Sequence, residues 1–74
     1  MGTERKNNVF DINTGANLKA LRERRNMSQQ ALGDKLGVTR TAVCHWESGE
    51  RGLLFSTAKQ ICKILDCQLE DLVK

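Results

Sequence analysis

Apolar residues recur at helical spacing along most of the chain, and this pattern predicts five helices. In the first, over roughly residues 15–25, Leu18 and Leu21 together with Ala20 form an apolar stripe, while charged residues face elsewhere. The same spacing returns after each short polar break. The other helices are predicted over roughly residues 29–36, 40–48, the stretch after Ser56 that contains Ala58, Ile61, Cys62 and Leu65, and 69–73.

Residues suited to begin and end helices mark the boundaries between these segments. Ser28, Thr39 and Ser56 each precede a helical stretch, and their hydroxyls can accept a hydrogen bond from its free backbone amides. Gly37 and Gly49 follow the second and third helices, where a residue free to adopt positive φ ends a helix. Two short helices joined by a short turn that contains glycine predict a helix-turn-helix unit. No alternating pattern indicates a strand, so the sequence predicts an all-α fold, a compact five-helix bundle.

The N-terminal segment differs from the rest of the chain. Residues 1–13 have no helical period, and their apolar residues are Val9, Phe10 and Ile12. We therefore expect a flexible N-terminal arm over residues 1–13 and one helix-turn-helix domain over residues 14–74.

Size and charge narrow the classes of function. The chain has 74 residues, of which 39% are hydrophobic, which suffices for one core but leaves no room for an enclosed substrate cavity of the usual enzyme size. We expect no enzyme activity and no cofactor. Twelve Lys and Arg against nine Asp and Glu give a net charge of +3, which suits an anionic partner.

The three cysteines, Cys44, Cys62 and Cys67, form no CxxC pair. This spacing predicts neither a disulfide framework nor a zinc site. Cys44 and His45 are consecutive on a predicted helix and point in different directions, which disfavours a metal site and a nucleophilic pair alike. Without a membrane-length apolar run or a secretory signal, we expect a soluble cytoplasmic protein with no membrane partner.

The third predicted helix divides into two faces. Ala42, Val43 and Trp46 are the inward candidates, and a lone tryptophan on such a stripe is typical of a core residue. The opposite stripe carries hydrogen-bonding groups and no acidic residue: Arg40, Thr41, Cys44, His45 and Ser48. A helix that reads DNA needs this division, because one face is fixed on the protein while the other reaches base edges in the major groove.

The stretch SQQALGDKLGVTRTAVCHWESGE, residues 28–50, resembles the helix-turn-helix of the Cro and phage-repressor family, also called the XRE family. The likeness extends over about residues 15–73. Its buried and turn positions are filled by the expected residue types: Leu32, Gly33, Leu36, Gly37, Val38, Val43 and Trp46. The chain departs from the pattern in having Leu53 where many members place proline. The resemblance implies a lambda-repressor-like fold and a DNA-binding transcriptional regulator.

The resemblance also implies roles for individual residues. Gln29, at the start of the second helix, should hydrogen-bond a phosphate. Arg40 is the best candidate for a base contact, with a phosphate contact as the alternative. Thr41 and His45 could contact bases, although His45 could also simply face water. Ser48 and Arg51 could contact the DNA backbone, and Thr39 could combine helix capping with a DNA contact. The role of the outward Cys44 is left open between a thymine methyl contact and oxidant sensing.

Arg22 and Glu47 match family positions that commonly form a buried ion pair between the first helix and the end of the third. This pair is expected to be structural, because it would hold the third helix in place.

By the same resemblance we expect a homodimer that binds a palindromic operator, with two third helices in successive major grooves. The candidate dimer surface is the loop after the third helix and the region around the fourth and fifth. An apolar run stands there that a small core cannot bury in full: Leu53, Leu54 and Phe55. Repression by occupancy of the operator is the simplest outcome. The alternative is an antitoxin or another protein-interaction module, since related folds carry both roles.

Overall fold

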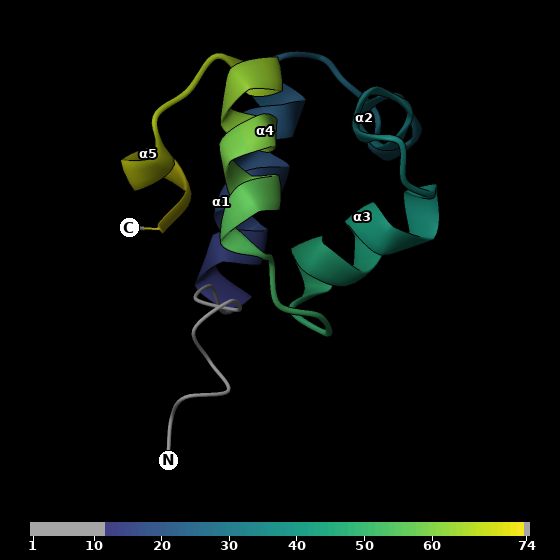
Figure 1. Cartoon of the computed structure of the whole chain (residues 1–74), viewed down its shortest axis with the longest axis horizontal. Coiled ribbons are helices and arrows are strands. Elements are labelled where there is room, and N and C mark those ends of the chain that lie inside the picture. Colours follow the sequence, from purple (N-terminus) through teal and green to yellow (C-terminus); the bar gives the residue numbers. More distant parts are fainter. Residues whose placement is uncertain (1–11, 74) are drawn as a thin grey trace.

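The computed structural model describes residues 12–73, and its elements are five helices (Figure 1). Their bounds are α1 Ile12–Arg24, α2 Gln29–Leu36, α3 Arg40–Ser48, α4 Phe55–Leu65 and α5 Leu69–Val73. The all-helical fold matches the prediction, and the bounds of α2, α3 and α5 agree with it. Of the predicted N-terminal arm, residues 1–11 lie outside the described residues.

Helix α1 begins earlier than predicted, at Ile12 rather than near residue 15. The next turn is buried: Thr14 is 4% exposed, and Gly15 lies against the end of α3. A side chain at position 15 would collide with α3, because an ideal Cβ there would lie 2.7 Å from the carbonyl oxygen of Glu47 and closer still to that of Trp46. Glycine disfavours helix by about 1 kcal/mol relative to alanine. Here it allows two backbones to approach closely, so packing decides where α1 begins.

Helix α4 does not use the predicted cap. Ser56 lies inside the helix and is exposed, and the N-cap position belongs to Leu54, whose side chain makes no capping hydrogen bond. The backbone amide of Ala58 donates to the carbonyl of Leu54 at 2.9 Å. Leu53, just before, is 3% exposed and Ala58 is fully buried, so the core contacts of these two residues set the start of α4.

The helices surround one core. In Figure 1, α2 and α3 lie on one side of α1 and α5 lies on the other, and α1 contacts both α3 and α5. Leu18 and Leu21 are buried as predicted, but Ala20 is exposed, because the buried face of α1 continues to Arg22 instead. The most deeply buried large side chains come from all five helices: Leu18, Leu32, Val43, Ile61, Leu65 and Leu72.

Three helices end in the same backbone motif. A left-handed residue lies directly after α2 and α4, at Gly37 (φ 76°) and Asp66 (φ 54°), and two positions after the last residue of α1, at Asn26 (φ 55°). In each case the next amide donates back to a carbonyl five residues earlier, as in Val38 to Gly33 at 2.9 Å. This Schellman arrangement satisfies carbonyls at the helix end and reverses the chain. It gives α1, α2 and α4 defined ends.

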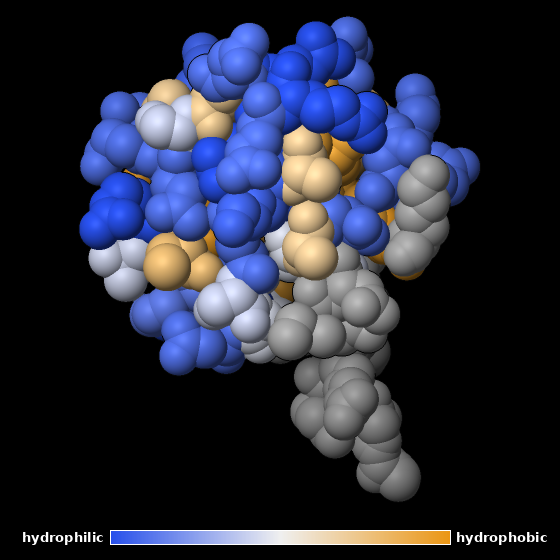
Figure 2. Space-filling model, turned by 180° about the vertical axis from the view of Figure 1, so that it is seen from behind, coloured by the Kyte–Doolittle hydropathy of each residue, from blue (hydrophilic) through white to orange (hydrophobic). Residues whose placement is uncertain are grey.

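Figure 2, the view from behind, shows a mostly hydrophilic surface with small separate apolar areas. Among the described residues, the large hydrophobic side chains that stay exposed are Leu54, Phe55 and Val73, at 44–45%. No described helix combines the length and apolar character needed to cross a membrane.

Candidate nucleic-acid interface

Two capped helices and a glycine turn place α3 at the surface. The Ser28 hydroxyl accepts from the amide of Ala31 at 3.0 Å, and the Thr39 hydroxyl accepts from the amide of Ala42 at 3.1 Å, so the predicted caps of α2 and α3 are present. Gly37 supplies the left-handed turn between them. These local signals set where the two helices begin and where the chain turns between them.

Gly33 is needed for the close approach of α2 and this turn. An ideal Cβ at position 33 would lie 2.9 Å from the carbonyl oxygen of Val38 and 3.3 Å from that of Thr39. The expectation of a small residue here therefore has a steric basis in backbone contact.

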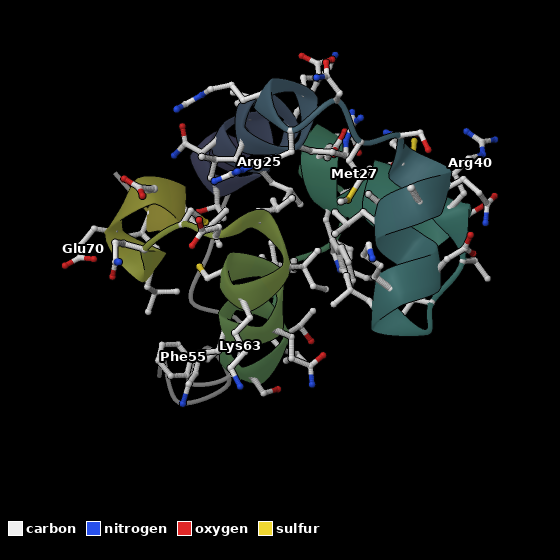
Figure 3. All side chains as sticks on the ribbon, turned by 90° about the horizontal axis from the view of Figure 1, so that it is seen from above. Arg25, Met27, Arg40, Phe55, Lys63 and Glu70 are labelled. Carbon is white, nitrogen blue, oxygen red and sulfur yellow. The ribbon has the colours of Figure 1, made fainter. Side chains whose placement is uncertain are left out.

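Helix α3 has the two faces that its sequence predicts. Val43 and Trp46 are buried, and Ala42 packs against the core. The opposite side chains are exposed, or partly exposed in the case of His45: Arg40, Thr41, Cys44, His45 and Ser48. Figure 3 shows Arg40 pointing away from the body of the protein, on the side opposite Phe55 and Glu70. The structure thus presents one continuous polar face of α3 to solvent.

The structure brings Arg22 and Glu47 together, as the sequence analysis expected. Arg22 Nε donates to Glu47 Oε2 at 2.6 Å and Nη2 donates to Oε1 at 3.1 Å, and the side chains are only 9% and 4% exposed. Arg22 Nη1 also donates to the carbonyl of Met27 at 2.7 Å. The hydrogen bond to Glu47 raises the pKa of Arg22, although burial acts in the opposite direction.

Gln29 extends this network in a way that the sequence did not reveal. Its Nε2 donates to Glu47 Oε1 at 2.9 Å, which ties the first residue of α2 to the end of α3. No buried side-chain nitrogen or oxygen within the described residues lacks a partner. Glu47 therefore orients Gln29 as well as neutralising Arg22. Because the pairing spans two helices, helical periodicity carried no signal for it.

A shallow open depression of about 210 Å³ lies beside the exposed face of α3. Lys19 on α1 lines it together with Gln29, Cys44, Glu47 and Ser48. Lys19 adds a positive charge next to the predicted contact residues. It was missed because its position on the exposed side of α1 gave no indication that α3 lies alongside.

Glu50 corrects the expectation that the outward face of α3 is free of acidic groups. Glu50 Oε1 lies 3.5 Å from His45 Nε2 and accepts a 3.3 Å hydrogen bond from Ser48 Oγ. The Ser48 hydroxyl also donates to the carbonyl of His45 at 3.2 Å. Arg51, which is exposed, donates its amide to that same carbonyl at 3.3 Å. Gly49, with φ 85°, allows the chain to fold Glu50 back onto the helix.

The described residues contain neither the ligand set of a metal site nor a pair of bonded cysteines. Within residues 12–73, no three His, Cys, Asp or Glu side chains are grouped so that they could hold a metal ion. The three cysteines are free thiols, with Cys44 exposed, Cys62 buried and Cys67 intermediate.

The exposed α3, held by α2 and a glycine turn within an all-helical core, defines a helix-turn-helix protein. A sequence profile of the helix-turn-helix family matches residues 18–72, and the chain belongs to this family, in its XRE-type group.

Curated relatives of the chain are named as HTH-type transcriptional regulators. The chain is 41% identical over 58 residues to YqaE of Bacillus subtilis (strain 168), an uncharacterised HTH-type transcriptional regulator, in a match that covers 78% of this chain and 50% of YqaE. It is 39% identical over 54 residues to YgzD of the same organism, also an uncharacterised HTH-type transcriptional regulator, covering 73% of this chain and 82% of YgzD. The chain thus spans about half the length of YqaE.

Solved structures share the fold. The restriction-modification controller protein C.AhdI from Aeromonas hydrophila superimposes with a TM-score of 0.77 at 26% identity, over 82% of this chain and 92% of that one. The P22 c2 repressor, solved in complex with a synthetic operator, gives a TM-score of 0.75 at 30% identity over the same shares. Hydroxypropylphosphonic acid epoxidase from S. wedmorenis gives 0.82 at 29% identity, but this chain corresponds to only 36% of the enzyme.

Proposed function

We propose that this chain is a transcriptional regulator that binds double-stranded DNA by placing α3 in the major groove. The observation that carries the proposal is the division of α3. Its inward residues are buried and Glu47 is locked to Arg22, whereas its outward side chains are exposed hydrogen-bonding groups with Arg40 at the first helical position. A rigid helix with such a face matches the geometry of major-groove recognition.

The proposed base contacts come from the N-terminal half of α3. The guanidinium of Arg40 is exposed and can pair with the O6 and N7 atoms of a guanine. Thr41 is the neighbouring candidate, with Cys44 and His45 one turn further along. The carboxylate of Glu50 lies 3.5 Å from His45 Nε2, which limits the bases that His45 can reach.

The proposed phosphate contacts surround this face. Gln29 is oriented by Glu47, which engages one of its amide protons and leaves the other for a phosphate oxygen. Lys19, Thr39, Ser48 and Arg51 flank it. Such contacts position the protein on the duplex and make binding depend on salt.

We further propose that the chain acts as a homodimer on a palindromic operator and represses by occupancy, as a cytoplasmic binding module rather than an enzyme. Leu54 and Phe55 remain exposed beside a buried Leu53, which leaves an apolar surface at the start of α4. Figure 3 shows Phe55 on the side of the molecule away from Arg40, so dimerisation there would leave the exposed face of α3 free. Two copies would present two such helices to successive major grooves.

The test is a fluorescence-anisotropy titration against duplexes selected from a random pool, at two salt concentrations. Arg40→Ala should lower discrimination at one symmetric base pair by roughly 5- to 150-fold, corresponding to the loss of one bidentate base contact. Lys63→Ala removes the same charge on the side of the molecule away from Arg40 and should leave discrimination unchanged.

Weak binding that is indifferent to sequence and to Arg40 would contradict the proposal. It would leave electrostatic attraction alone and favour the protein-interaction module instead.

A further inference from the structure

The end of α4 brings two cysteines together that the proposed function does not use. Asp66 is left-handed, with φ 54° and ψ 55°, and its amide donates to the carbonyl of Cys62. The amide of Cys67 donates to that same carbonyl at 3.0 Å. In this helix-ending motif the side chains at these two positions often make an apolar contact. Here both are thiols.

The same motif elsewhere in the chain shows what is distinctive about this one. At the ends of α1 and α2 the residue that follows the left-handed position is Met27 or Val38, and both pack against the core. Cys67 is the equivalent residue at the end of α4 and packs against the core in the same way. Five positions earlier, α4 has Cys62, whereas α1 and α2 have Arg22 and Gly33. The backbone geometry that often brings two apolar side chains together therefore brings two thiols together here.

The environments of the two thiols are unequal. Cys62 is 9% exposed, and the pKa of its thiol is raised to about 12, first by burial, then by its hydrogen bond with the Cys67 thiol and by the charges of Cys67, Asp71 and Glu70. Cys67 is partly exposed. A reagent in solution thus meets Cys67 first, with Cys62 held against it from the inside.

We propose that Cys62 and Cys67 form a dithiol site that hydrogen peroxide oxidises to an intramolecular disulfide. The sulfur of Cys67 attacks one oxygen of hydrogen peroxide, so that an S–O bond forms and the O–O bond breaks. The departing hydroxide takes the proton of the Cys67 thiol and leaves as water, giving a sulfenic acid. The sulfur of Cys62 then attacks the Cys67 sulfur. The S–S bond forms, the S–O bond breaks, and the departing hydroxide takes the proton of the Cys62 thiol to give a second water. Two thiols are oxidised and one peroxide is reduced to two waters.

The disulfide would close the corner between α4 and α5. Helix α5 contacts α1 and α4, and the side chain of Asn17 donates to the carbonyl of Leu72 at 2.9 Å. A covalent link at this corner restrains the unfolded chain and the attachment of α5. Figure 3 places Glu70 of α5 and Arg40 of α3 on opposite sides, so the exposed face of α3 should not change. We expect oxidation to raise the midpoint of thermal unfolding.

The test is oxidation of the full chain carrying Cys44→Ser with limiting hydrogen peroxide, followed by intact mass and peptide mapping. The expected result is the loss of two hydrogens, a Cys62–Cys67 linked peptide, protection of both thiols from alkylation, and reversal by dithiothreitol. Adding Cys67→Ser should abolish the loss. Adding Cys62→Ala should leave Cys67 as a sulfenic acid that dimedone traps.

A second measurement does not depend on any variant folding. Phenylarsine oxide bridges only thiols that lie close together, so it should add once to the unmodified chain and block Cys62 and Cys67 in the same peptide map. If both thiols remain free to alkylation after peroxide treatment, or if every disulfide joins two chains, the proposal is wrong.

Discussion

Glu47 and Arg22 form a two-pronged buried ion pair that joins the end of α3 to α1. The same carboxylate accepts a hydrogen bond from Gln29, and the same guanidinium donates to the carbonyl of Met27. One acidic group thereby connects three helices. Both charged groups have left bulk water, so their mutual contact is what makes their burial tolerable.

Removing one member of this pair should destabilise the protein strongly. Glu47→Ala leaves the Arg22 guanidinium buried without its partner, which typically costs about 3–5 kcal/mol. Urea unfolding followed by circular dichroism measures the loss. Arg25→Ala is the control. Its ion pair with the Asp66 carboxylate, at 3.5 Å, and its 3.2 Å hydrogen bond to the Asp66 carbonyl are both exposed, and exposed ion pairs contribute about 0–1 kcal/mol. Equal losses for the two variants would show that the buried pair has no special role.

The close approach of α1 and α3 predicts that Gly15→Ala is destabilising despite the higher helix propensity of alanine. The new methyl group would overlap the carbonyl oxygens of Trp46 and Glu47 and push the helices apart. We expect a net loss of about 1–2 kcal/mol in the free energy of unfolding. Gly37→Ala is a useful comparison, since its Cβ would meet nothing within 4 Å and only its backbone, at φ 76°, is unfavourable. Asparagine tolerates that backbone better, so Gly37→Asn should recover stability, whereas Gly15→Asn should not. A stable Gly15→Ala protein would refute the contact.

The contribution of the Thr39 cap to stability can be distinguished from that of Thr41 on α3. Thr39→Ala removes the hydroxyl that accepts from the amide of Ala42 and should cost about 1 kcal/mol of stability. Thr39→Ser keeps the acceptor and should restore it. Thr41→Ala, on the exposed face two residues later, should leave thermal stability nearly unchanged. Differential scanning calorimetry on the three variants distinguishes them, and a cap that matters no more than Thr41 would contradict the assignment.

The buried thiol of Cys62 makes stability depend on alkaline pH. Its pKa is raised in the folded state, from an ordinary value of 9.0 to about 12. Above pH 9 the unfolded chain therefore loses this proton while the folded chain retains it, so stability is full below pH 9 and falls as pH rises towards 12. This one proton can favour unfolding by up to about tenfold per pH unit. Urea unfolding at several pH values should show a smaller decline for Cys62→Ala than for the unmodified chain. Parallel declines would mean that Cys62 titrates normally.

The apolar surface at the start of α4 should determine self-association. Phe55→Ser and Leu54→Ser replace exposed apolar side chains and are expected to weaken the proposed homodimer at least tenfold while changing stability by less than about 1 kcal/mol. Sedimentation equilibrium over a range of concentrations measures the change. Lys63→Ser, also exposed on α4, serves as the control. A dimer that all three variants leave intact must use another surface.

Local signals predicted the helix-turn-helix well. Ser28, Gly37 and Thr39 act within a few residues of their own positions, so α2 and α3 begin and end where the sequence indicates. The starts of α1 and α4 depend instead on contacts between distant segments. Gly15 is packed against α3 and Leu53 is buried in the core, and these contacts determine where α1 and α4 begin. No local sequence pattern indicates such contacts.

The candidate site shows the same division. Helical periodicity placed the outward side chains of α3 correctly, since a face follows from spacing alone. It missed Lys19 and the bond from Gln29 to Glu47, because both depend on which helix packs against α3. It also missed Glu50, because Glu50 lies after the helix and is turned back onto it at Gly49. Family likeness indicated the Arg22 and Glu47 pair, although these residues lie 25 positions apart.

The residues that anchor α3 and the residues it exposes are separate sets. Val43, Trp46 and Glu47 hold the helix, helped by the bare backbone of Gly15. Arg40, Thr41 and Cys44 point into solvent from the same nine-residue helix. Natural selection can therefore rewrite the exposed positions while leaving the folding energetics nearly untouched. A duplicated copy of this gene could diverge towards a different target through a few substitutions, without passing through an unstable intermediate.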